Sequence, residues 1–179
     1  MRTLIDGVSP SEVAEVFDDF HRRVSETKLL SKFRFMDGRY LLLLDGSEYF
    51  SSNKCSCPGC LQAESADGTI RFHHQILQMV LAKPGMKHVL PFGAEEVCRQ
   101  DGITKEDCEI NAAKRLIPRI VANHPHMDLV LVADGLYSNV PFISLLQSCH
   151  LSFVLVAKPG NHQALFEDLT GLRKAGAVG

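Results

Sequence analysis

Two short apolar runs, each followed by the pair Asp-Gly, constrain the fold of this chain more than any other feature. The first run occupies positions 40–44 (Tyr-Leu-Leu-Leu-Leu) and precedes Asp45, and the second occupies positions 129–133 (Leu-Val-Leu-Val-Ala) and precedes Asp134. Unbroken apolar runs of this length are typical of strands that are covered on both faces. The sequence therefore predicts two buried strands, each of which ends at an aspartate.

Helical and strand-like patterns surround these two runs in a definite order. A capping box at Ser9-Pro10-Ser11-Glu12 predicts a first helix, and a polar, turn-rich segment at 51–68 predicts an excursion rather than a strand. The elements expected after the excursion are strands around 70–81 and 87–92, a helix over 105–123, the strand at 129–133, a helix over 141–149, a strand at 153–157 and a helix over 161–174.

This order of elements is that of an α/β, ribonuclease-H-like fold. We expect a mixed five-stranded sheet, three antiparallel strands and then two parallel ones, flanked by helices and incomplete at its C-terminal end. Residues 1–32 are expected to form a helical N-terminal segment, and residues 33–179 the domain itself. Right-handed crossovers make the first and fourth strands of such a sheet parallel neighbours. Asp45 and Asp134 should then lie side by side.

Two neighbouring carboxylates repel each other unless a cation holds both in the ionised form. Mg²⁺, or Mn²⁺ in its place, prefers hard oxygen ligands and binds one or two carboxylates together with water and phosphate oxygens. Asp45 and Asp134 are therefore candidate ligands of a phosphodiester-cleaving metal site. An aspartate at a strand end is also commonly a turn former or a helix cap, and the pattern alone leaves both interpretations open.

Composition adds limits on location and partners. No stretch approaches the roughly 20 apolar residues of a membrane span, and the first residues lack a signal-peptide pattern, so we expect a cytoplasmic protein that does not enter a membrane. The net charge of −2 gives no general attraction to nucleic acid. Local phosphate contacts are expected from Lys114, Arg115 and Lys158, although a short basic cluster on a helix is more often simply solvated.

Several short motifs are similar to those of one protein family. They are Leu43 to Ser52 around Asp45, Cys57-Pro58-Gly59-Cys60-Leu61, Gln100-Asp101-Gly102 with Asp107-Cys108-Glu109 and Asn111-Ala112-Ala113-Lys114-Arg115, Asp134-Gly135-Leu136-Tyr137, and Lys158-Pro159-Gly160-Asn161-His162. Together they span about residues 33–167, and they resemble the DDE-type transposases of bacterial insertion sequences. The resemblance is to the large cut-and-paste group, whose third catalytic residue lies in a tyrosine–arginine–glutamate–lysine signature.

The resemblance implies DNA transposition through two-metal chemistry, with Asp45 and Asp134 as the first two catalytic metal ligands. Transposon-end DNA would be the partner, and the chain would form a homodimer in the transposition complex. The third carboxylate belongs on a helix after a further insertion, and its signature is absent here. Glu167 is the candidate substitute. We therefore expect a truncated catalytic domain that is inactive by itself.

The cysteines suggest a second kind of site. Cys57 and Cys60 have the spacing of half a zinc site, and Cys55 or the pair His73-His74 are candidates for the remaining ligands of a Zn²⁺ ion. Reduced thiols in a surface excursion are the plainer interpretation. An alternative function follows from the zinc interpretation: a catalytically silent domain that binds nucleic acid or a partner and is held together by zinc.

Overall fold

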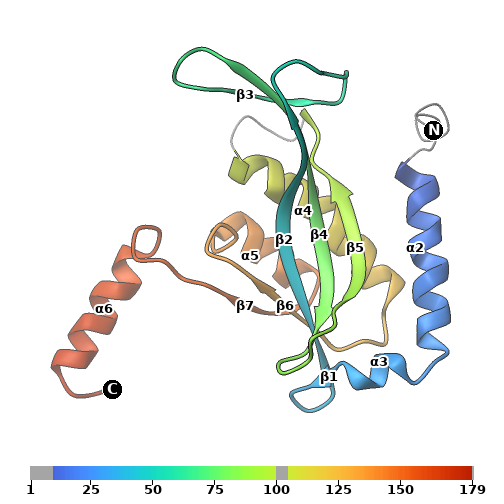
Figure 1. Cartoon of the computed structure of the whole chain (residues 1–179). Helices are drawn as coiled ribbons and strands as arrows, with labels where there is room; N and C mark the ends of the chain where they lie inside the picture. The colour runs from blue at the N-terminus through green and yellow to red at the C-terminus, as the bar shows by residue number, and fades with distance from the viewer. Residues whose placement is uncertain (1–9, 100–104, 179) are drawn as a thin grey trace.

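The computed structural model describes residues 10–99 and 105–178, so Ser9 of the expected capping box and the motif at 100–102 lie outside the described residues. The elements in chain order are α2 (Pro10–Ser25), α3 (Leu29–Lys32), β1 (Arg34–Phe35), β2 (Arg39–Ser52), β3 (Leu61–Glu64), β4 (Ile70–Ala82), β5 (Leu90–Glu96), α4 (Lys105–Asn123), β6 (Leu129–Ala133), α5 (Val140–Ser148), β7 (Ser152–Leu155) and α6 (Gln163–Lys174) (Figure 1).

The described strands form one mixed sheet of seven strands. Its main path is β3–β4–β2–β6–β7, while β5 pairs with β4 and β1 pairs with β2. The pairs among β1 to β5 are antiparallel, and the pairs β2–β6 and β6–β7 are parallel. Because β2 occupies one edge of β4, the strands β3 and β5 share its other edge, one after the other. The expected α/β class and the mixture of antiparallel and parallel strands are confirmed.

The predicted number of strands is wrong, since the short strands β1 and β3 join the five expected ones in the sheet, and two details of the predicted strands are wrong as well. The first buried strand does not end at Asp45, since β2 continues to Ser52 and keeps its antiparallel pairing with β4 as far as the pair Ser52 and Phe72. The expected excursion at 51–68 contains β3, which pairs with the first residues of β4. In both cases backbone hydrogen bonds to the long strand β4 hold polar residues in extended conformation, and this outweighs their weak preference for strands.

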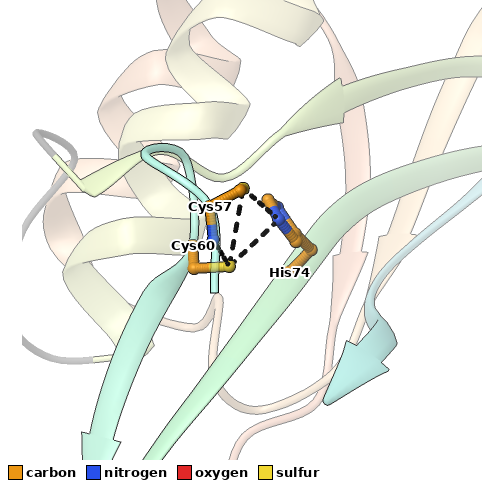
Figure 2. Close-up of side chains that lie close together, drawn as sticks. All are labelled: Cys57, Cys60 and His74. Carbon is orange, nitrogen blue, oxygen red and sulfur yellow. Dashed lines mark hydrogen bonds between the residues drawn. The ribbon is translucent and has the colours of Figure 1, made fainter. Parts of the chain in front are cut away.

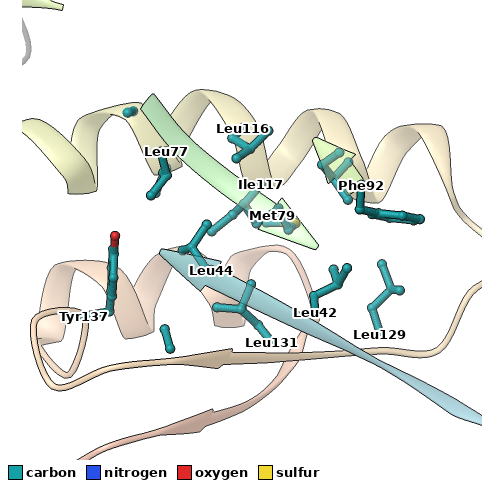
Figure 3. Packing of buried hydrophobic residues seen from close by; sticks show 14 of the residues in the cluster. Leu42, Leu44, Leu77, Met79, Phe92, Leu116, Ile117, Leu129, Leu131 and Tyr137 are labelled. Carbon is teal, nitrogen blue, oxygen red and sulfur yellow. The ribbon is translucent and has the colours of Figure 1, made fainter. Parts of the chain in front are cut away.

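The core lies between the central strands and the helix α4 (Figure 3). Leu42 and Leu131 are fully buried on β2 and β6, and Leu116 and Ile117 meet them from the buried face of α4. Each such side chain contributes about 1.5–3 kcal/mol when it is removed from water. The helix approaches β5 so closely that a Cβ atom on Gly93 would lie 2.7 Å from Cδ1 of Ile120. The packing therefore fixes α4 against the antiparallel part of the sheet.

The two ends of the chain differ in how they pack. Helix α2 lies against β5, where His21 is buried and its Nε2 is 2.8 Å from the carbonyl oxygen of Pro91, and Val24 belongs to the core cluster. Helix α6 has no buried residue and projects away from the sheet (Figure 1). The expected N-terminal segment is thus joined to the sheet by packing, whereas α6 is joined to it through β7.

Candidate functional site

The parallel register of β2 and β6 brings the two aspartates to the same place in the sheet. Leu44 pairs with Ala133, and Asp45 and Asp134 are the next residue of each chain segment. Both side chains are exposed. Their adjacency follows from the connection through α4, which leads the chain from β5 to the free edge of β2, and from the equal phase of the two apolar runs, as the sequence predicts.

Each of these aspartates uses one carboxylate oxygen to organise its own backbone. Oδ1 of Asp45 accepts a hydrogen bond from the N–H of Gly46 at 2.9 Å, and Oδ1 of Asp134 accepts one from the N–H of Leu136, also at 2.9 Å. The turn after β6 then leads into α5, whose N-cap Asn139 accepts a hydrogen bond from the N–H of Phe142 at 3.0 Å. The second oxygen of each carboxylate remains for another ligand.

Lys158 lies over the Asp134 turn. Its Nζ is 4.0 Å from Oδ2 of Asp134, and its aliphatic stem covers Gly135, where an added Cβ atom would lie 2.6 Å from Cε of the lysine. Both charged side chains are more than half exposed, so their attraction is screened and adds little to stability. The lysine therefore puts a positive charge beside this carboxylate.

A third carboxylate, Glu109 of α4, lies buried behind the aspartates and only 1% of it is exposed. Its Oε1 accepts a hydrogen bond from Nε2 of Gln75 at 2.5 Å, and its Oε2 accepts one from the hydroxyl of Tyr137, also at 2.5 Å. The carboxylate also packs on Gly46, where an added Cβ atom would lie 2.5 Å from Oε1. Glu109 thus connects α4 with β4, with the segment after Asp45 and with the turn after Asp134.

The pKa of the Tyr137 hydroxyl is shifted by burial and by the charges around it. Burial raises the pKa of its hydroxyl well above the ordinary value of a tyrosine, and the hydrogen bond to Glu109 and the negative charges of Glu109, Asp45 and Asp134 raise it further. The phenol therefore remains protonated and donates a hydrogen bond to Glu109. The sequence points to Tyr137 through its place three residues after Asp134, but it does not show that Glu109 is its partner.

A pocket of about 640 Å³ opens on the other side of Gly46. Its polar lining includes Arg71, His73 and Arg99. Arg71 forms an ion pair with Glu48, and this hydrogen bond lowers the pKa of the Glu48 carboxyl below its ordinary value. Nε of Arg99 donates a hydrogen bond to the carbonyl oxygen of Cys60. A groove with basic side chains thus runs from the segment after Asp45 toward the cysteine-containing excursion.

The other predicted phosphate contacts lie away from the two aspartates. Arg115 forms an ion pair with Glu95 at 2.7 Å and also donates to the carbonyl oxygen of Glu96, while Nζ of Lys114 donates to Oδ1 of Asn111 at 2.9 Å. These side chains are exposed but engaged on α4 and β5. Of the three predicted contacts, Lys158 is the one that the fold places beside a candidate metal ligand.

Glu167 is not brought to the aspartates. It is exposed on α6, where it lines a shallow hollow together with Pro159, Phe166 and Lys174. Figure 1 shows α6 separated from the ends of β2 and β6. In the described residues, Glu109 is the carboxylate that the fold places behind Asp45 and Asp134.

The cysteine-containing excursion folds back onto β4 and places two thiols around one histidine (Figure 2). Nε2 of His74 is 3.2 Å from Sγ of Cys57 and 3.4 Å from Sγ of Cys60, and the two sulfur atoms are 3.5 Å apart. Hydrogen bonding from Cys60 and then from His74 lowers the pKa of the Cys57 thiol. Cys55 is exposed and does not join this group. The three side chains form a group that can hold a metal ion.

No protein-family model matches the chain, and no curated protein matches its sequence. Among residues 10–99 and 105–178, no helix combines the length and the apolar character needed to cross a membrane.

Proposed function

We propose that this chain is part of a DDE-type transposase catalytic domain, inactive by itself, in which Asp45 and Asp134 hold the Mg²⁺ ion used for DNA phosphodiester hydrolysis and strand transfer in the full-length protein. The observation that carries the proposal is the register of β2 and β6, which aligns Leu44 with Ala133 and so makes the two aspartates neighbours. The motifs around both residues, which resemble those of the transposases of bacterial insertion sequences, give the reaction class.

The strand order supports the ribonuclease-H-like fold that this function requires. When β1 and β3 are set aside, β5 and β4 are antiparallel to their neighbours, β2 is central, and β6 and β7 follow in parallel. This is the arrangement of three antiparallel strands and two parallel strands expected from the sequence. In such a sheet the first and fourth strands of the fold, here β2 and β6, carry the first two acidic ligands.

The donor set fits a hard cation. Oδ1 of each aspartate accepts a hydrogen bond from a backbone N–H, which orients the carboxylate, and both side chains are exposed. Mg²⁺ takes one or two carboxylates and completes its shell with water and phosphate oxygens. When bound, the metal would activate the attacking oxygen and stabilise the charge on the leaving oxygen.

The remaining side chains of the site would position the reacting groups. Lys158 can contact a phosphate oxygen beside Asp134, and Arg71 and Arg99 give the neighbouring pocket a positive wall for the DNA backbone. The buried hydrogen bond between Tyr137 and Glu109 would help to keep Asp45 and Asp134 in their relative positions. The proposed partner is transposon-end DNA, bound by two copies of the chain.

The direct test is binding and cleavage of DNA with Mg²⁺ or Mn²⁺ as the only divalent ion. Because the third carboxylate is not brought to the site, we expect metal-dependent DNA binding without nicking of supercoiled plasmid, and loss of that binding in Asp45→Asn and in Asp134→Asn. The matched control is Asp128→Asn, because Asp128 precedes the opposite end of β6 and forms an exposed ion pair with Arg39. Metal-dependent binding that survives both substitutions, or that fails equally in the control, contradicts the proposal, and nicking by the native chain would show that it contains a third metal ligand.

A second candidate function is supported by the group of Cys57, Cys60 and His74. In this alternative the chain is a catalytically silent domain that binds nucleic acid or a protein partner and is held together by a structural zinc ion. This alternative would be favoured by DNA binding that persists in Asp45→Asn and Asp134→Asn but is lost when zinc is removed.

A further inference from the structure

The spacing of the three ligand atoms in the cysteine excursion can be compared with the dimensions of a metal site. For Zn–S bonds of about 2.3 Å and a Zn–N bond of about 2.0–2.1 Å at tetrahedral angles, the sulfur atoms lie about 3.8 Å apart and each lies about 3.6 Å from the nitrogen. The corresponding distances here are 3.5 Å between Cys57 and Cys60, and 3.2 and 3.4 Å to Nε2 of His74. Opening the triangle by a few tenths of an ångström gives one face of the tetrahedron.

The backbone of the excursion is already shaped for two sulfur ligands. The N–H of Cys60 donates to the carbonyl oxygen of Cys57 at 3.1 Å, and the N–H of Cys57 donates to Sγ of Cys60 at 3.2 Å. These bonds close a tight turn that points both sulfur atoms toward β4. The sulfur of Cys60 is buried there, and Cys57 lies at the surface.

The histidine is held in the orientation that a ligand needs. Its Nε2 faces the sulfur atoms, and its Nδ1 is buried without a hydrogen bond, 3.4 Å from Oε1 of Glu96, so that a small shift of this carboxylate would complete one. The ring of Tyr49 stacks on the imidazole with the centroids 5.7 Å apart. A carboxylate behind the second ring nitrogen is the usual partner of a metal-bound histidine, because it fixes the tautomer and makes the ligand more basic.

We propose that Cys57, Cys60 and His74 bind one Zn²⁺ ion, with Glu96 supporting the histidine and solvent in the fourth coordination position. Two thiolates and an imidazole match the preference of zinc among the common divalent ions. The site is separate from the aspartates and does not rest on the function proposed for them.

The ion would also shape the pocket beside Asp45. The carbonyl oxygen of Cys60 holds Arg99, and Leu61, the next residue, begins β3 and lines the pocket. Zinc would therefore attach to β4 the segment around Cys60, whose carbonyl oxygen holds Arg99 at the pocket. Without the metal, the part of the excursion that precedes β3 is joined to β4 through the weak contacts of the thiols with His74, so its backbone should open more often.

The experiment is a measurement of zinc content on the full chain, purified with a thiol reductant and Zn²⁺ and then freed of loose metal by gel filtration. We expect one zinc per chain in the native sequence, and loss of zinc in Cys57→Ser, Cys60→Ser and His74→Ala. Glu96→Gln should weaken zinc affinity by about 10–100-fold. The matched controls are Cys55→Ser and His73→Ala, which should keep one zinc per chain.

Two further measurements use the native chain, so that they do not depend on whether the variants fold. Co²⁺ added to the folded native chain should give the charge-transfer absorption of cobalt bound to thiolates, with an intensity that corresponds to two sulfur ligands. Removal of zinc by a chelator should increase hydrogen–deuterium exchange in residues 53–64 and leave β6 unchanged. Asp45→Asn and Asp134→Asn should retain zinc, so this inference and the proposed function can fail separately.

Several results would overturn the inference. They are a native chain that elutes without zinc, a disulfide between Cys57 and Cys60 that persists in the presence of the reductant and metal, and zinc content that survives His74→Ala. Loss of zinc in Cys55→Ser would also overturn it, because the ligand set would then be closed by a third thiolate.

Discussion

The hydroxyl of Tyr137 donates a hydrogen bond of 2.5 Å to Oε2 of Glu109 and thereby ties the turn after β6 to helix α4. The second oxygen of the same carboxylate accepts from Gln75 on β4 and packs against Gly46. One buried side chain therefore connects the backbone next to Asp45 with the turn that follows Asp134. The relative position of the two aspartates depends on this connection as well as on the pairing of their strands.

Removing the hydroxyl of Tyr137 should lower the stability of the fold. In Tyr137→Phe the buried carboxylate of Glu109 loses a hydrogen bond and gains no solvent in return, so we expect a loss of about 1–3 kcal/mol in the free energy of unfolding. The measurement is urea unfolding followed by circular dichroism. Tyr49→Phe is the control, because Tyr49 is exposed and should change stability by less than about 0.5 kcal/mol. Equal stability of the two variants would show that the Tyr137 hydrogen bond carries no weight.

The close approach at Gly46 predicts that even a methyl group is not tolerated there. In Gly46→Ala the new Cβ atom would lie 2.5 Å from Oε1 of Glu109 and 2.9 Å from Nε2 of Gln75. Relieving this clash should cost about 1–3 kcal/mol of stability and should displace the neighbouring Asp45. Gly160→Ala is the control, since nothing lies within 4 Å of the added atom. A Gly46→Ala protein as stable as this control would refute the tight packing of the carboxylate.

The raised pKa of Tyr137 gives a stability profile at alkaline pH. The pKa of Tyr137 in the folded chain is above the value of about 10 in the unfolded chain. The protonated hydroxyl therefore contributes its full share of the free energy of unfolding below pH 10, and this share is lost as the pH rises beyond that value. The native chain should lose up to about 1.4 kcal/mol per pH unit from this group, and Tyr137→Phe should lack that loss.

The stability difference between the native chain and Tyr137→Phe should therefore shrink between about pH 10 and 11. Urea unfolding at several pH values measures this difference, and phenolate absorbance follows the ionisation. The chain has three tyrosines. Because the folded pKa of Tyr137 is raised, its phenolate should appear only with unfolding. A difference that stays constant across this pH range would mean that Tyr137 ionises freely in the folded protein.

The periodic and apolar parts of the chain could be predicted from the sequence because their signals are local. The runs before Asp45 and Asp134 gave the right strands and the right neighbours, since apolar phase and crossover handedness determine both. The extension of β2 to Ser52 could not be predicted, because polar residues become strand there only through pairing with β4.

Parts of the candidate sites required the folded chain for the same reason. Glu109 reads as an acidic residue near the start of a helix, which the helix dipole alone would explain. Its partners Gln75 and Tyr137 are 34 and 28 residues away in the sequence. His74 was one of two adjacent histidines, and the sheet decides that it faces the thiols while His73 lines the pocket. Such long-range relations leave no local pattern in the sequence.

The central claim is that Asp45 and Asp134 together hold a divalent metal, and binding of Mn²⁺ measured by electron paramagnetic resonance tests it most directly. The chain should first be loaded with Zn²⁺, so that the thiol group does not take up the manganese. We predict saturable Mn²⁺ binding that is competed by Mg²⁺, is lost in Asp45→Asn and in Asp134→Asn, and is retained in Asp128→Asn. Binding that is unchanged by either substitution, or absent from the native chain, would contradict the account.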